Sequence, residues 1–139
     1  MSRKRKRTRP GDPRVSQYGW YVALEVERYD HYSQDLSNPK RRCSVNQNTG
    51  LIQARTPKEA YRKALALGRA VDGIECVDLD KRRRKGVWRF VGLANLLPVY
   101  EKIEDGCEIL RTKRYCSAET AERMVRQKRE LAVFRRSPE

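Results

Sequence analysis

Strand-like segments follow one another along this chain, with one clear helix between the earlier and the later ones. In the first, Tyr18–Glu27, side chains alternate between an apolar series that includes Trp20 and a more polar series. A strict alternation of strand and helix is missing, so we do not expect a doubly wound parallel sheet. The order predicts an α+β fold, an antiparallel sheet of four to five strands with two helices packed on one face. Further strand candidates are residues 51–55, 74–79, 87–93 and 107–115.

Two segments carry helix start signals. Thr56 is an N-cap candidate, Pro57 suits the first helical position, and Glu59 completes a capping box. Gly68 is the expected end of this helix, whose predicted apolar stripe is Ala60, Tyr61, Ala64 and Leu67. Ser117 is expected to cap a second helix, with Glu119 in its first turn and a stripe that reaches from Ala118 to Leu131.

The connections are predicted from polar residues and turn signals. Tyr29–Arg42 is expected to be a loop, Cys43–Val45 a brief edge strand, and Asn48–Gly50 a turn. Residues 74–79 and 87–93 are expected to form a hairpin whose tip is the Lys81–Lys85 run. Ala94–Leu97 is expected to form one helical turn before Pro98.

Charge is distributed unevenly over the 139 residues, which carry a net charge of +14. Residues 17–80 are neutral, whereas residues 1–16 hold seven basic groups and one acid. Like charges and a Pro/Gly pair predict a disordered basic arm over residues 1–16, followed by a single domain over 17–134 and a tail over 135–139. The length suits one domain with one modest core.

Clustered cations attract polyanions, because each neutralised phosphate releases counterions. We therefore expect the arm and the hairpin tip to contact nucleic-acid phosphates without reading sequence, since no recognition helix is apparent. The alternatives are solvated charge without a dedicated partner, or a protein-interaction module, such as an immunity or toxin-neutralising partner, that uses the neutral residues 20–80. The candidate phosphate-binding residues are Arg3, Lys4, Arg5, Lys6, Arg7, Arg9, Lys81, Arg82, Arg83, Arg84 and Lys85.

Signatures of common hydrolases, metalloproteases and nucleotide-binding enzymes do not occur, so we expect no enzyme, cofactor or metal site. His31, the one histidine, is expected to be a surface loop residue. Alternating carboxylates near the hairpin tip are also a pattern for a metal-dependent nuclease, although an exposed strand face is favoured. These carboxylates are Asp72, Glu75, Asp78 and Asp80.

Aromatic and sulfur-containing residues are expected to be structural for the most part. Trp20 and Trp88 are predicted to lie in the core, whereas Tyr21, Tyr29 and Tyr32 are left as surface contacts. The four cysteines form no C-x-x-C pair, which favours reduced and mostly packed thiols over a zinc site. No apolar run is long enough to span a bilayer and no secretory signal is apparent, so a cytoplasmic protein without a membrane partner is expected.

Five segments together resemble the bacterial domain of unknown function family 4288. They contain the motif WYVA, a helix that opens T-P-x-E-A-Y, and the strand RFVGL. The resemblance covers about residues 20–115 and implies a small self-contained domain, but no particular activity. The segments are Gly19–Ala23, Leu51–Ala54, Thr56–Ala64, Trp88–Tyr100 and Glu104–Glu108.

Overall fold

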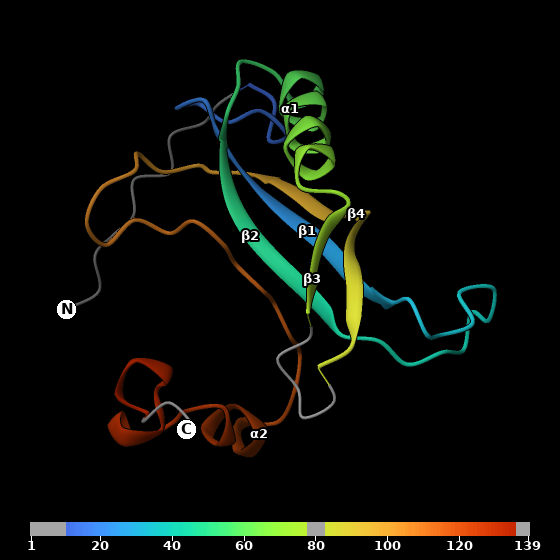
Figure 1. Ribbon diagram of the computed structural model, residues 1–139. Coiled ribbons are helices and arrows are strands. Elements are labelled where there is room, and N and C mark those ends of the chain that lie inside the picture. Colours follow the sequence, from blue (N-terminus) through green and yellow to red (C-terminus); the bar gives the residue numbers. More distant parts are fainter. Residues whose placement is uncertain (1–10, 78–82, 136–139) are drawn as a thin grey trace.

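The computed structural model describes residues 11–77 and 83–135. Four strands form one antiparallel sheet in the order β2-β1-β4-β3, and helix α1 crosses one face of it (Figure 1). This arrangement confirms the predicted α+β class. The strands are β1 (Trp20–His31), β2 (Val45–Gln53), β3 (Ile74–Val77) and β4 (Lys85–Pro98).

β1 is longer than expected and lies at the centre of the sheet. It continues past Glu27 to His31, because β4 pairs with it along this whole polar stretch. Tyr21 and Tyr29 are buried, so their prediction as surface contacts was wrong, whereas Tyr32 is exposed. The face of β1 that meets the helix carries Tyr21 and Ala23, opposite to Trp20. Trp20 and Trp88 are only half-buried, so the prediction that they lie in the core was wrong.

β2 runs without interruption through Asn48, Thr49 and Gly50, where a turn was predicted. These three residues pair in regular register with Glu25, Leu24 and Ala23 of β1. Pairing over nine residues supplies backbone partners that outweigh the local turn preference of this tripeptide.

α1 (Pro57–Ala70) starts as predicted. The Thr56 hydroxyl accepts a hydrogen bond from the Glu59 backbone nitrogen at 3.1 Å. The helix continues past Gly68, which is buried against the Phe90 ring and does not end it. Tyr61 and Leu67 are exposed, so the buried stripe is narrower than predicted. The core cluster between helix and sheet is Tyr21, Ala23, Ile52, Ala54, Ala60 and Ala64.

β3 and β4 form the predicted hairpin, with residues 78–82 outside the described ranges. β4 extends to Pro98, so the helical turn predicted at Ala94–Leu97 was wrong. Pairing explains the difference, because Leu96 and Leu97 lie opposite Ala23 and Val22 of β1. β4 also carries two irregularities against β1, opposite Leu24/Glu25 and Val26/Glu27.

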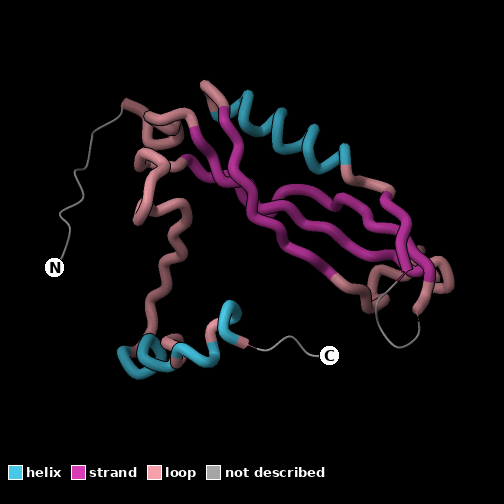
Figure 2. The backbone as a smooth tube through the Cα atoms, turned by 60° about the vertical axis from the view of Figure 1, so that its left-hand side comes forward, coloured by secondary structure: helices cyan, strands magenta, loops and turns pink. Residues whose placement is uncertain are grey.

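The segment after β4 leaves the sheet. Cys107–Tyr115 is not a strand, in contrast to the prediction. The Glu108 backbone nitrogen donates to the Glu101 carboxylate at 2.8 Å, and the segment pairs with neither edge strand of the sheet. Ser117 caps α2 as expected, but α2 covers only Ala118–Arg123. Neither α2 nor the two short 3-10 helices that follow packs on the described sheet, and Figures 1 and 2 show them apart from it. Short helices are only marginally stable in water without tertiary packing, which explains why α2 does not extend further.

Candidate nucleic-acid interface

Three of the predicted phosphate-binding residues, Arg83, Arg84 and Lys85, are described by the structure. Arg83 and Lys85 are exposed and Arg84 is half-buried. Arg83 has a backbone φ of 44°, which places it in the left-handed region, as is common in turns. The predicted residues of the arm between Arg3 and Arg9, together with Lys81 and Arg82, lie outside the described residues.

An aromatic cluster fixes the base of the hairpin. The Tyr29 hydroxyl lies 2.7 Å from the carbonyl oxygen of Cys76 on β3 and 2.9 Å from that of Arg84, the residue before β4. Its ring stacks edge-on against His31 and tilts against Trp88. Gly86 makes room for this ring, because a Cβ there would lie 2.6 Å from Tyr29 Cζ. Arg83 therefore lies immediately beyond the point where Tyr29 holds the two arms of the hairpin together.

His31 belongs to this cluster and not to a surface loop. It is the last residue of β1 and is 3% exposed, so its prediction as a surface loop residue was wrong. The strand extends this far because His31 pairs with Gly86 at the start of β4.

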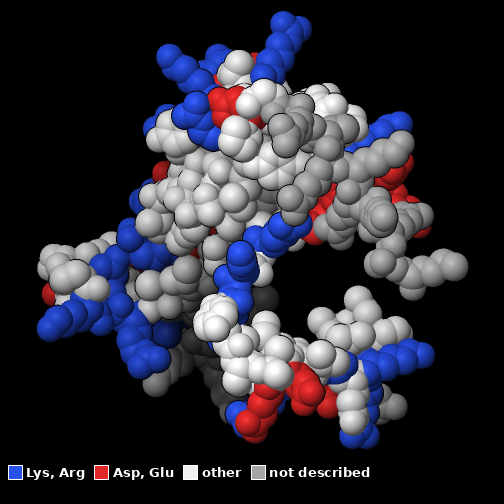
Figure 3. All heavy atoms as spheres, turned by 180° about the vertical axis from the view of Figure 1, so that it is seen from behind, with Lys and Arg blue, Asp and Glu red and all other residues white. Residues whose placement is uncertain are grey.

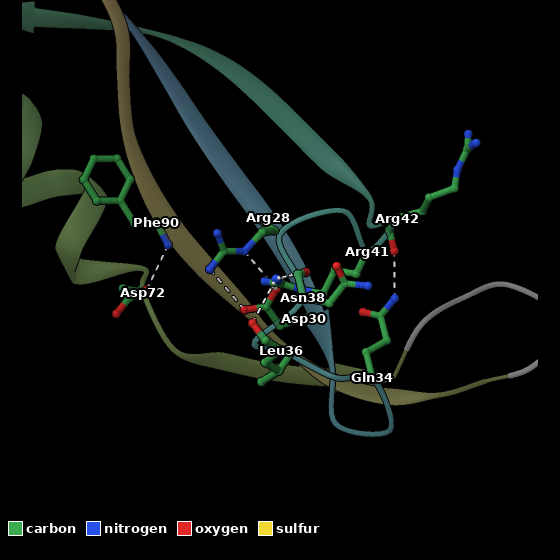
Figure 4. Close-up of polar contacts among 9 residues, drawn as sticks. All are labelled: Arg28, Asp30, Gln34, Leu36, Asn38, Arg41, Arg42, Asp72 and Phe90. Atoms are coloured by element: carbon green, nitrogen blue, oxygen red, sulfur yellow. Dashed lines mark hydrogen bonds and ion pairs between the residues drawn. The ribbon is translucent and has the colours of Figure 1, made fainter.

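The loop between β1 and β2, residues 32–44, lies at the same end of the sheet as the hairpin turn (Figure 2). Arg41 organises this loop. Its guanidinium donates to the carbonyl oxygens of Leu36 and Asn38, each at 3.0 Å, and to the Asp30 carboxylate at 3.1 Å (Figure 4). Gln34 closes the loop by donating to the Arg42 carbonyl oxygen at 2.7 Å. Arg41 thus acts within the fold and is not available for a ligand.

Asp30 anchors this loop through its carboxylate, which binds Arg41. It is 4% exposed and also accepts two hydrogen bonds from the Arg28 guanidinium, the shorter at 2.8 Å. Burial by itself raises the pKa of Asp30, but the hydrogen bonds and charges of Arg28 and Arg41 outweigh it and hold that pKa below its usual value. Asp30 therefore stays ionised at neutral pH.

Four exposed cations remain at this end of the sheet, Lys40, Arg42, Arg83 and Lys85, and we call them the basic end. None of the four has a carboxylate partner among the residues that the structure describes. In Figure 4 the Arg42 side chain points away from the Asp30 cluster. In Figure 3, the view from behind, Lys and Arg side chains gather at the left, where this end of the sheet lies.

Sequence reasoning missed half of the basic end. The run Lys40-Arg41-Arg42 follows Pro39 and was visible in the sequence. Its position beside the hairpin turn was not visible, because that depends on the antiparallel pairing of β1 with both β2 and β4. The structure thus adds a second basic segment to the one predicted.

The root of the arm lies at the opposite end of the sheet. The Ser16 hydroxyl donates to the Val99 carbonyl oxygen at 2.6 Å, and the Ser16 backbone nitrogen donates to the Tyr21 hydroxyl at 3.1 Å. Tyr100 donates its hydroxyl hydrogen to the carbonyl oxygen of Pro13. β1 has 12 residues, so roughly 40 Å separate this root from the hairpin base at about 3.3 Å per residue. The root of the arm and the base of the hairpin therefore lie at opposite ends of the sheet.

The other candidate sites have structural explanations where they are described. The Asp72 carboxylate accepts from the Phe90 backbone nitrogen at 2.8 Å, and Glu75 accepts from the Tyr32 hydroxyl. Asp78 and Asp80 lie outside the described ranges. Within those ranges, no group of His, Cys, Asp and Glu could hold a metal ion, and no helix has the length and apolarity to cross a membrane.

All four cysteines lie in the described part of the chain and are free thiols. Cys43 and Cys107 are half-buried, as a packed thiol would be, whereas Cys76 and Cys116 are exposed. The expectation of mostly packed thiols therefore fits only two of the four.

These features define a class of small α+β domains, in which a four-stranded antiparallel sheet carries one packed helix. Residues 20–111 match the family model named Domain of unknown function (DUF4288), and the chain belongs to this family. The match agrees with the resemblance found from the sequence motifs. No curated protein and no solved structure matches the chain.

Proposed function

We propose that this protein is a non-enzymatic accessory module that contacts nucleic-acid phosphates without sequence specificity. The observation that supports the proposal most is the basic end, where two segments far apart in sequence present Lys40, Arg42, Arg83 and Lys85 together. Phosphate backbones bind such clusters through counterion release, whatever their base sequence.

The local charge balance favours an anionic partner. Seven Lys and Arg residues and three carboxylates occur in residues 28–44, 75–77 and 83–85. Each carboxylate is already engaged: Asp30 by two arginines, Asp35 by Ser37, and Glu75 by Tyr32. None of these carboxylates pairs with an exposed cation of the basic end, and the basic groups outnumber them by four, so positive charge remains for a ligand. A rigid hairpin base also lowers the entropy that an ordered contact would cost.

The test is a salt titration of binding to a DNA duplex and to a single strand. The variant Lys40→Gln, Arg42→Gln, Arg83→Gln, Lys85→Gln should lower the slope of log affinity against log salt by about 3 to 4 for the duplex, because each lost phosphate contact removes about 0.9. A matched control removes four exposed cations from the other end and from α1: Arg55→Gln, Lys58→Gln, Arg62→Gln, Arg69→Gln.

The control has the same net charge, so it separates a local contact from general attraction. Equal losses in both variants, or binding that does not change with salt, would contradict the proposal. Deletion of residues 2–9 tests the arm separately. Its effect should add to that of the basic-end variant, because the arm root and the basic end are roughly 40 Å apart.

A second candidate function is a protein-interaction module, such as an immunity or toxin-neutralising partner. Apolar side chains on the C-terminal segment support it, since Val125, Val133 and Phe134 are 79%, 84% and 53% exposed and contact no strand. A protein that co-purifies through nuclease treatment and high salt, and is lost on truncation after Arg111, would favour this candidate over the first.

A further inference from the structure

The outer edge of β2 lacks the features by which proteins protect an exposed strand. Natural edges are short, or carry charges, prolines or bulges that prevent pairing with another chain. β2 has nine residues, Val45–Gln53, with no charged residue and no proline, and its register against β1 is regular. This occurs in a chain of which 36% is charged. The other edge strand, β3, has only four residues and includes Glu75.

The register shows which backbone groups of β2 face outward. Ala54 donates its backbone hydrogen to Gly19, and Tyr29 donates to Ser44, each at 2.9 Å. Hydrogen-bonded pairs alternate in an antiparallel ladder, so the even-numbered residues of β2 bond to β1. The odd-numbered residues direct their N–H and C=O groups to the open edge: Val45, Gln47, Thr49 and Leu51.

One contact supports this assignment independently. The carbonyl oxygen of Gln53, the next odd-numbered residue, accepts a hydrogen bond from Lys63 of α1 at 2.7 Å. The helix thus satisfies the last outward carbonyl of the strand. From Val45 to Leu51 the outward backbone groups have no partner among the residues that the structure describes.

We infer that this edge pairs with the same edge of a second copy of the chain. The two β2 strands run antiparallel about a two-fold axis at Asn48, and the two sheets join into one of eight strands. Val45 then lies opposite the partner's Leu51, and Gln47 lies opposite the partner's Thr49. All four outward-facing residues are paired in this register, and the carbonyl oxygen that Lys63 holds is left undisturbed.

Side-chain chemistry favours a second copy as the occupant. Val45 and Leu51 are 58% and 43% exposed. In the two-fold register, Val45 of one copy packs beside Leu51 of the other copy, so both side chains become covered. Polar residues meet polar residues at the two central pairs, as stable cross-strand pairing requires. Copies with a net charge of +14 repel each other over most of their surface, and an uncharged edge adds no like charges across the contact.

The first experiment measures the mass of the full chain in solution by sedimentation velocity, after nuclease treatment and in high salt. The expected species is a dimer that dissociates on dilution. Thr49→Pro removes one outward N–H without touching the ladder to β1, and should give a monomer. The matched control Thr49→Val keeps the N–H and should remain dimeric. A monomeric wild-type chain, or a dimeric Thr49→Pro variant, would overturn the inference.

The second experiment tests the register itself and does not depend on how well Thr49→Pro folds. In a background of Cys76→Ser and Cys116→Ser, Asn48→Cys should cross-link to its copy on mild oxidation. Residues at a non-hydrogen-bonded position have Cα atoms about 4.5 Å apart, within disulfide range. Asn46→Cys lies on the same face of β2 but opposite the partner's Gly50. Equal cross-linking of the two variants, or none with Asn48→Cys, would refute the two-fold pairing.

Discussion

Asp30 is the residue on which the loop at the basic end depends. Its carboxylate is buried and accepts from both Arg28 and Arg41. Asp30→Asn leaves two guanidinium groups without a countercharge and should lower the free energy of unfolding by about 2 kcal/mol. Urea denaturation followed by circular dichroism measures this. Asp35→Asn, an exposed change in the same loop, is the control and should cost less than about 0.5 kcal/mol.

The lowered pKa of Asp30 also predicts a pH dependence. A carboxylate whose folded-state pKa lies below its usual value of 3.8 stabilises the fold above that pH, and this contribution is lost as pH falls through the lowered value. The wild-type chain should therefore lose stability below about pH 4 more steeply than Asp30→Asn. Parallel stability profiles for the two proteins on the acid side would contradict the assigned role of Asp30.

Gly86 allows the aromatic cluster at the hairpin base to form. A Cβ at this position would lie 2.4 Å from the Asp30 carbonyl oxygen and 2.8 Å from the Tyr29 hydroxyl oxygen. Gly86→Ala should lower the free energy of unfolding by about 2 kcal/mol or more, because β1 and β4 must move apart to make room for the methyl group.

The matched control for Gly86 is Gly50→Ala, where a Cβ would have nothing within 4 Å. Its unfolding free energy should stay within about 0.5 kcal/mol of the wild-type value. Thermal melts of both variants measure the difference. Equal destabilisation would show that loss of strand glycine in general, and not the close approach of Tyr29 and Asp30, is responsible.

Individual residues show where sequence reasoning has its limits. The run of cations at Lys81–Lys85 is apparent in the sequence, and so is the one at Lys40–Arg42. Their juxtaposition, and the engagement of Arg41 by Asp30, depend on strand pairs that no local pattern specifies. The burial of His31 has the same origin, since a polar stretch becomes a strand only when a partner strand lies beside it.

At the scale of elements, replacing the N-cap residue by alanine should have different effects on the stability of the fold for α1 and α2. Thr56 caps α1, which packs on the sheet, so Thr56→Ala should lower the free energy of unfolding by about 1 kcal/mol. Ser117 caps α2, which does not pack on the sheet. Ser117→Ala should leave the global transition unchanged and reduce only local helicity. Chemical denaturation measures the first effect, and hydrogen exchange at residues 118–123 measures the second.

Helix starts were predictable because a cap is a local signal, carried by Thr56 and Glu59 or by Ser117. The ends of the strands were not predictable from local signals, because β1 and β4 extend as far as they pair with each other. The second helix starts as predicted, but its predicted length and packing were wrong for a related reason. Its apolar stripe was read from periodicity, but Met124 and Val125 are exposed and pack on no strand.

At the scale of the whole molecule, the segment after residue 111 contributes little to the fold. No described helix in that segment packs on the sheet. A chain truncated after Arg111 should therefore unfold with the same free energy, within about 0.5 kcal/mol, and with the same dependence on urea. Because the family match ends at the same residue, a large loss of stability would place an essential contact beyond the matched segment.

The strand order also has a consequence during synthesis on the ribosome. Tyr21 pairs with Ile52 on one side and with Pro98 on the other. The central strand of a nascent chain is therefore covered on one flank early, while its second neighbour has not yet been translated. At about 5 to 20 residues per second, this half-covered interval lasts roughly 2 to 9 s. During that time the backbone groups of β1 that later bond to β4 have no partner strand within the chain.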